Sequence, residues 1–132
     1  MDKQKLLQEK GLKTTTARVA LLDFLEQEGS PLDVVTIVEK LHQQADQATV
    51  YRILDILTKK DLVNRLEFGE GKYRYEIQKN HHHHLICTNC GTISDVPGDF
   101  LGKFEKEIKD KKGFLVKSHL LEFFGLCRSC QS

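Results

Sequence analysis

The sequence predicts an α+β fold in two parts, because the spacing of its apolar residues changes along the chain. From residue 2 to about 60, apolar side chains recur at the spacing of amphipathic helices. Over residues 62–77 they alternate with polar ones, which is the pattern of β-strands. The remainder mixes both patterns, and 132 residues fit one domain or two small ones that share an interface.

Cap and turn residues bound each element predicted in the first part. The elements are a helix between the threonines 14–16 and Gly29-Ser30-Pro31, a helix over 34–41 capped by Asp33, a helix from about Gln47 to Lys60, and a hairpin of 62–68 and 72–77. Helices followed by a two-stranded hairpin are typical of a winged helix-turn-helix, whose third helix enters the major groove of DNA.

The third helix presents polar residues suited to DNA on its solvent face. Thr49, Tyr51 and Arg52 offer hydrogen-bonding and phosphate-seeking groups. The alternative is that they merely solvate the exposed face of a small helical bundle. The net charge of +1 gives no general attraction for nucleic acid, so DNA binding requires locally placed cations and an oligomer.

The second part predicts a mixed sheet with one helix. Residues 83–96 indicate a hairpin, and Phe100, Phe104 and Ile108 recur at helical spacing with lysines on the opposite, solvent side. Gly113 is expected to end that helix, and residues 114–124 have the pattern of a long strand.

Two Cys-x-x-Cys pairs, Cys87/Cys90 and Cys127/Cys130, predict a structural zinc site. Four thiolates complete a tetrahedral shell and leave no open position for catalysis. We find no apolar run long enough for a membrane span and no signal peptide, so we expect a soluble cytoplasmic protein. Thiols stay reduced in the cytoplasm, which favours zinc over disulfides.

The run His81-His82-His83-His84 predicts metal binding on two faces of a strand. Side chains alternate along a strand, so His82 and His84 share one face, and His81 and His83 the other. Imidazole suits iron, zinc, nickel, copper and manganese. Two alternatives remain: only one face binds metal, or the run is a fragment of an affinity tag.

Other candidate ligands are less distinctive. His119 lies on the predicted C-terminal strand, and Glu76 and Asp95 are carboxylates near the histidine strand. Each of the three alone is an ordinary polar residue. An enzyme is not expected, because the chain has no nucleophile motif and no phosphate-binding loop.

Four motifs, in order along nearly the whole chain, resemble those of the ferric uptake regulator family. They are Gly11-Leu12-Lys13 with Thr16-Ala17-Arg18, Ala48-Thr49-Val50-Tyr51-Arg52, His82-His83-His84-Leu85-Ile86-Cys87-x-x-Cys90-Gly91, and Gly125-Leu126-Cys127-x-x-Cys130. The resemblance implies a homodimeric, metal-responsive transcription factor. It also implies a winged-helix DNA-binding domain over 1–77, a hinge over 78–81 and a metal-binding α/β dimerisation domain over 82–132.

The resemblance implies roles for individual residues. Lys13 matches a minor-groove or backbone contact, Arg18 matches a phosphate contact, and the recognition helix carries Thr49, Tyr51 and Arg52. The cysteines match the structural zinc site. A regulatory hinge site for Fe²⁺, Zn²⁺ or Mn²⁺ matches Glu76, His82, His84 and Asp95, and a further site matches His81, His83 and His119.

The chain departs from the family pattern at two positions. The hinge site usually has another histidine from the DNA-binding domain, where this chain reads Gly29-Ser30-Pro31-Leu32. The acidic ligand of the further site would fall at Gly102. Either Asp99, Glu105 or Glu67 substitutes for a missing ligand, or these sites bind metal with fewer protein ligands and a water.

The expected function is a metal-dependent repressor of metal-homeostasis genes that binds a palindromic, AT-rich operator as a homodimer. A peroxide-sensing regulator of the same family is the first alternative. The others are a zinc-stabilised metal-binding or storage protein without DNA activity, and a metallohydrolase that uses the histidine strand.

Overall fold

A computed structural model of the chain describes residues 2–78, 82–97, 101–117, 119 and 121–131. The chain divides into two compact units, Met1–Gln78 and Lys79–Ser132. His81, Asp99 and Phe100, as well as most of the expected hinge, lie outside the described residues. None of the helices in the described ranges has the length and apolar character that a membrane crossing requires.

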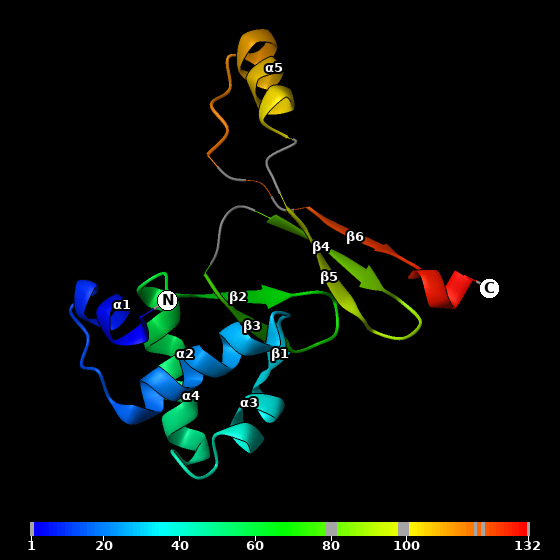
Figure 1. Cartoon of the computed structure of the whole chain (residues 1–132). Coiled ribbons are helices and arrows are strands. Elements are labelled where there is room, and N and C mark those ends of the chain that lie inside the picture. Colours follow the sequence, from blue (N-terminus) through cyan, green and yellow to red (C-terminus); the bar gives the residue numbers. More distant parts are fainter. Residues whose placement is uncertain (1, 79–81, 98–100, 118, 120, 132) are drawn as a thin grey trace. The chain divides into compact units, whose positions relative to one another are not determined.

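Within its described residues, the first unit combines four helices with a small sheet (Figure 1). The elements are α1 Lys3–Glu9, α2 Thr16–Glu28, β1 Leu32–Asp33, α3 Val34–Lys40, α4 Gln47–Lys59, β2 Val63–Glu67 and β3 Tyr73–Ile77. The strands lie in the order β1-β3-β2, and both pairings are antiparallel. The predicted helices and hairpin are thus present, whereas the short edge strand β1 was not predicted.

Side-chain caps explain where these helices begin. Thr15 Oγ1 accepts a hydrogen bond from the Arg18 amide at 3.2 Å, and Asp46 Oδ1 accepts one from the Thr49 amide at 2.8 Å. Each satisfies a backbone donor that the first helical turn leaves unpaired. Gly29 ends α2 in the left-handed conformation, with φ of 70°.

The core of the first unit lies between the helices and the sheet. The residues predicted to face inward from α4 are all buried: Val50, Ile53, Leu54 and Leu57. They pack with the leucines of α2, which are also buried. Burial of one such side chain contributes about 1.5–3 kcal/mol. This core fixes α4, so its opposite face is left for solvent or a partner.

The hairpin of β2 and β3 is tied to the loop before α3. Arg74 forms a two-pronged ion pair with Glu70, with distances of 2.8 and 2.9 Å. Its Nη1 also donates to the Pro31 carbonyl at 3.2 Å. Pro31 is among the fully buried residues of the chain. The loop at Pro31 is therefore buried and bonded to the wing through Arg74.

The second unit is a three-stranded sheet with one α-helix and a short 3₁₀ turn in its described part (Figure 1). The elements are β4 His82–Cys87, β5 Ile93–Pro97, α5 Gly102–Lys112, β6 Glu122–Gly125 and η1 Arg128–Gln131. The strand order is β5-β4-β6, with β5 antiparallel and β6 parallel to β4. The central strand is therefore the one that carries the histidines.

The expected strand over 114–124 is wrong at the described residues 114–117, 119 and 121, since β6 begins at Glu122. The parallel register explains this limit. Glu122 pairs with His84 in this parallel register. Residues 114–117 would therefore extend past His82, where β4 begins, and have no partner on that strand. His119 therefore precedes the strand on which we expected it.

The apolar face of α5 is the second difference. Its periodicity predicts burial, yet none of its described residues is buried, and Phe104 is 61% exposed. Periodicity shows that a face is apolar but does not show what covers it. In this single chain nothing in the described part covers Phe104.

Candidate metal centres and DNA-binding surface

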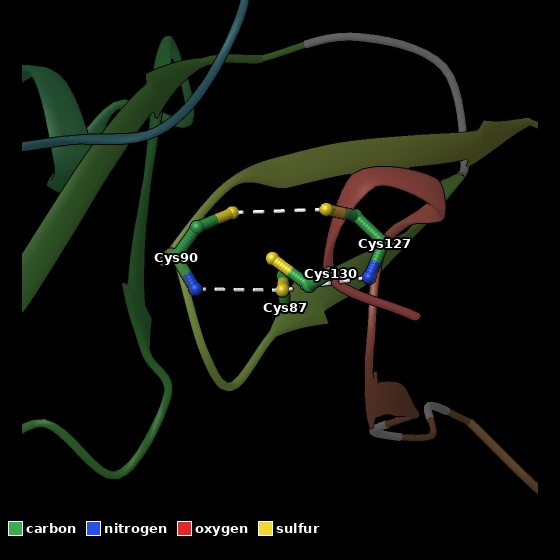
Figure 2. A group of neighbouring side chains, drawn as sticks. All are labelled: Cys87, Cys90, Cys127 and Cys130. Atoms are coloured by element: carbon green, nitrogen blue, oxygen red, sulfur yellow. Dashed lines mark hydrogen bonds between the residues drawn. The ribbon is translucent and has the colours of Figure 1, made fainter. Parts of the chain in front are cut away.

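The four cysteines come together as predicted (Figure 2). Their sulfur atoms all lie within 4.8 Å of one another, and Cys90 Sγ is 3.8 Å from Cys127 Sγ. Tetrahedral zinc with bonds of about 2.3 Å places its sulfurs about 3.8 Å apart. All four cysteines are free of disulfides. The cluster therefore has the four thiol ligands and the close spacing that a zinc site requires.

Backbone hydrogen bonds position the two cysteine pairs. The Gly91 amide donates to the Cys87 carbonyl at 2.9 Å and closes the first turn, for which Gly91 adopts φ of 79°. The Thr88 amide donates to the Gly125 carbonyl at 2.8 Å. This bond holds the C-terminal segment beside β4, so Cys127 and Cys130 face the first pair, as Figure 2 shows.

The surroundings of Cys87 favour its thiolate form. The amides of Cys90 and Cys127 point at Cys87 Sγ, with distances of 3.5 and 3.4 Å. These two bonds, that from Cys90 first, lower the pKa of Cys87 to about 6. A thiolate is the form that binds metal, so this sulfur is prepared for zinc at neutral pH.

Sequence reasoning missed the amide of Asn89, whose Nδ2 donates to Cys130 Sγ at 3.3 Å. This bond lowers the pKa of Cys130, but the neighbouring thiols of Cys127 and Cys87 outweigh it and raise the pKa to about 11. Without a cation the sulfurs resist ionising together. The only sequence signal for Asn89 is its position inside the Cys-x-x-Cys turn.

The predicted alternation of the histidines is present in β4. The rings of His82 and His84 meet edge to face, with centroids 4.8 Å apart. Asp95 lies directly opposite His84 in the antiparallel pairing, and His84 Nε2 is 3.8 Å from Asp95 Oδ1. The ligand atoms of these three residues lie within 4.8 Å of one another. Two imidazoles and a carboxylate on one sheet face suit Fe²⁺, Zn²⁺ or Mn²⁺.

Glu76, the other predicted ligand of this site, lies in the first unit. It is the next-to-last residue of β3 and is only 3% exposed. A carboxylate so buried is uncommon unless it is paired or bound to a metal. That Glu76 joins the histidines stays a prediction, to which we return below.

A second group forms around His83, which is 4% exposed. The rings of His83 and His119 stack, with centroids 5.2 Å apart and 30° between their planes. Glu105 of α5 reaches His119, with Oε1 3.0 Å from Nδ1. Glu105, one of the acids considered as substitutes, is thus in contact with a predicted ligand of this site, whereas Asp99 lies outside the described residues.

The predicted DNA contacts lie on two segments of the first unit. Tyr51, 47% exposed, and Arg52 project from α4, where Arg52 Nη2 donates to Thr49 Oγ1 at 3.2 Å. Lys13 is exposed before α2, and Arg18 Nη1 donates to the Lys13 carbonyl at 3.0 Å. Arg18 therefore also shapes the backbone that presents Lys13.

A winged-helix unit joined to a metal-binding α/β unit defines a class, the metal-responsive DNA-binding regulators. The chain belongs to the ferric uptake regulator family, whose sequence profile matches residues 9–124. Members of this family are metal-responsive transcriptional regulators that bind DNA and form dimers, and they are not enzymes. Membership also sets aside the storage protein and the metallohydrolase considered from the sequence.

Individual relatives agree with this assignment. The ferric uptake regulation protein of Bacillus subtilis is 36% identical, over 89% of this chain and 81% of its own. The Vibrio cholerae ferric uptake regulator structure superposes with a TM-score of 0.79 at 31% identity, covering 96% of this chain and all of its own. The Helicobacter pylori regulator, whose structure reveals three functional metal binding sites, gives 0.81 at 29% identity, covering 98% and 89%.

Proposed function

We propose that this chain is a homodimeric repressor of metal-homeostasis genes. It binds a palindromic, AT-rich operator when a divalent metal, Fe²⁺, Zn²⁺ or Mn²⁺, occupies a site formed by Glu76, His82, His84 and Asp95. The convergence of His82 and His84 of β4 with Asp95 of β5 on one face of the sheet carries the proposal. Because its target is chromosomal DNA, we place the protein in the cytoplasm.

The chain connectivity supports the inclusion of Glu76. Residues 77–81 link it to His82, and an extended chain spans at most about 3.3–3.6 Å per residue. The linker therefore keeps Glu76 within about 20 Å of His82 and allows both to bind one metal. A metal that binds both would restrain the wing and its recognition helix relative to the second unit. The family histidine near Ser30 is replaced, so Glu76 is the ligand that we assign to the first unit.

The exposed apolar residues of the second unit support a homodimer. Phe123 and Phe124 are 42% and 56% exposed, although neighbours on a strand point to opposite faces. β6 is also an edge strand. Leu85 and Leu126 extend this apolar surface, and exposed apolar patches of this kind mark interaction sites. Dimeric helix-turn-helix proteins bind two half-sites about one turn of DNA apart, which is why we propose a palindromic operator.

The test is fluorescence anisotropy of a labelled palindromic operator with protein that retains its structural zinc. Adding Fe²⁺ without oxygen, Zn²⁺ or Mn²⁺ is expected to raise the DNA affinity of the wild-type chain. His84→Ala should lose this response. His42→Ala should keep it, since His42 is an exposed residue whose Nδ1 contacts the Glu39 carbonyl. A metal response equal in all three proteins would reject the assignment of the site.

A further inference from the structure

The histidine pair on the other face of β4 has defined tautomers. His83 Nδ1 lies 3.2 Å from the Leu121 carbonyl, which can only accept, so Nδ1 carries the proton. His119 Nδ1 lies 3.0 Å from a Glu105 carboxylate oxygen, which also accepts. In a neutral imidazole the lone pair then belongs to Nε2. Both rings therefore present the same nitrogen as the metal-binding atom.

The distance between the ring centroids is one that a shared metal allows. At zinc–nitrogen distances of about 2.0–2.1 Å, two imidazoles on one tetrahedral ion have centroids roughly 5 Å apart. His83 and His119 have centroids 5.2 Å apart. Their side chains are also shielded from water, with His83 4% and His119 19% exposed.

Glu105 differs in role from an acid placed at Gly102. Resting on the second metal site predicted above, we propose that Glu105 is a positioning residue that holds His119 through Nδ1, and not a metal ligand. A carboxylate that accepts the second N–H of a ligating histidine fixes the ring and raises its basicity. The acid has moved almost one helical turn along α5 from the family position.

This arrangement has a consequence for metal choice. With the carboxylate outside the coordination shell, the metal has one oxygen ligand fewer. Histidine nitrogens then make up a larger share of its protein ligands. Imidazole nitrogen suits Zn²⁺, whereas carboxylate oxygen suits Mn²⁺. The site is therefore tuned toward Zn²⁺ and away from Mn²⁺, compared with a site that has an acid at position 102.

The first test follows the imidazole nitrogens by ¹⁵N NMR in the full-length zinc-replete protein during addition of Zn²⁺. We expect Nε2 of His83 and His119 to shift while their Nδ1 protons are retained. Absence of any shift at either ring would reject the second site itself. Loss of the His119 Nδ1 proton on binding would reject only the role of Glu105.

The second test compares the Zn²⁺ affinity of the second site among variants. A chelating dye competes for the Zn²⁺, and the His119 resonance reports occupancy of this site. Glu105→Ala should weaken Zn²⁺ about 10–100-fold. Glu105→Gln, whose side-chain carbonyl still accepts from Nδ1, should restore most of that affinity. Glu107→Gln is the matched control on an exposed position of α5. Equal losses in Glu105→Gln and Glu105→Ala would show that the hydrogen bond to Nδ1 does not support Zn²⁺ binding and would overturn the proposal.

The third test restores the acid at the family position. Gly102→Glu adds an oxygen donor and should lower the ratio of Zn²⁺ affinity to Mn²⁺ affinity relative to wild type. The same competition assay measures both affinities. An unchanged ratio would contradict the proposed basis of selectivity.

Discussion

Lys72 Nζ donates to Asp33 Oδ2 at 2.7 Å and ties the turn of the wing to the first residue before α3. The other carboxylate oxygen, Oδ1, accepts from the Thr36 amide at 2.9 Å and caps α3. These contacts, that with Lys72 first, hold the pKa of Asp33 well below its usual range. One carboxylate thus fixes both the helix and the wing of the DNA-binding unit.

Two substitutions separate the functions of Asp33. Asp33→Asn keeps an oxygen for the Thr36 amide but removes the charge, and should destabilise the first unit by about 0.2–1 kcal/mol. Asp33→Ala also removes the cap, which adds about 0.5–2 kcal/mol. Hydrogen exchange of the α4 amides measures the loss of stability in each variant. Equal losses in the two variants would contradict the separation of the ion pair from the cap.

The same comparison has a defined dependence on pH. The folded pKa of Asp33 lies below the unfolded value of about 3.9, so the unfolded state binds more protons as pH falls. The stabilisation of the folded state by ionised Asp33 is therefore present above about pH 4 and is lost as pH falls through the folded pKa. The stability difference between wild type and Asp33→Asn should shrink on acidification. A difference that grows would contradict the assignment.

Removal of the structural zinc should unfold the second unit. Zinc binding to such sites is worth about 10–16 kcal/mol, which exceeds the stability of most small domains. Cys127→Ser should therefore abolish amide protection in β4 and leave the core of α2 and α4 protected. Asn89→Ala loses only the bond to Cys130 Sγ and should keep the fold with zinc held about 10–100-fold more weakly. Full protection of β4 in Cys127→Ser would refute the structural role.

The sequence allowed correct prediction of features that depend on local spacing. The two Cys-x-x-Cys turns, the alternation of His82 to His84 and the inward face of α4 follow from the period of a turn, a strand or a helix. The meeting of the two cysteine pairs, which are distant in sequence, was predicted from the requirement of zinc for four ligands. The structure brings together the residues of each group as expected.

Features that depend on contacts between distant residues could not be predicted in this way. The grouping of His83 with His119 was expected from the family resemblance alone, and Glu105 was one of three candidate acids, because the path of the chain after α5 is not defined by periodicity. The exposure of Phe104 has another cause, because an apolar stripe looks the same whether its own chain or a second copy covers it.

The exposed apolar residues on and beside β6 predict that two copies of the chain form a dimer through this strand. Phe124→Glu places a charge on an exposed edge-strand position and should convert the proposed homodimer into a monomer, measured by sedimentation velocity. Lys109→Glu, on the exposed part of α5, is the control and should stay dimeric. If Phe124→Glu sediments as a dimer with unchanged affinity, β6 is not part of the interface.

The DNA-binding surface should divide into positioning and reading contacts. Lys13→Ala is expected to weaken binding to all sequences alike and to lower the salt slope by about 1. Arg52→Ala removes a side chain of the recognition helix and should cost about 1–3 kcal/mol, with relaxed sequence preference. Binding assays at several salt concentrations check both, while metal affinity stays constant. Unaltered operator binding by Arg52→Ala would remove α4 from the interface.

The central claim is that metal and DNA binding are coupled through Glu76, His82, His84 and Asp95. The most direct test measures regulatory-metal affinity by calorimetry with and without operator, in wild type and in Glu76→Gln. Coupling predicts that operator tightens metal binding by the factor by which metal tightens operator binding, about 5–150-fold, and that Glu76→Gln abolishes it. Equal metal affinity with and without operator in the wild-type protein would contradict the account.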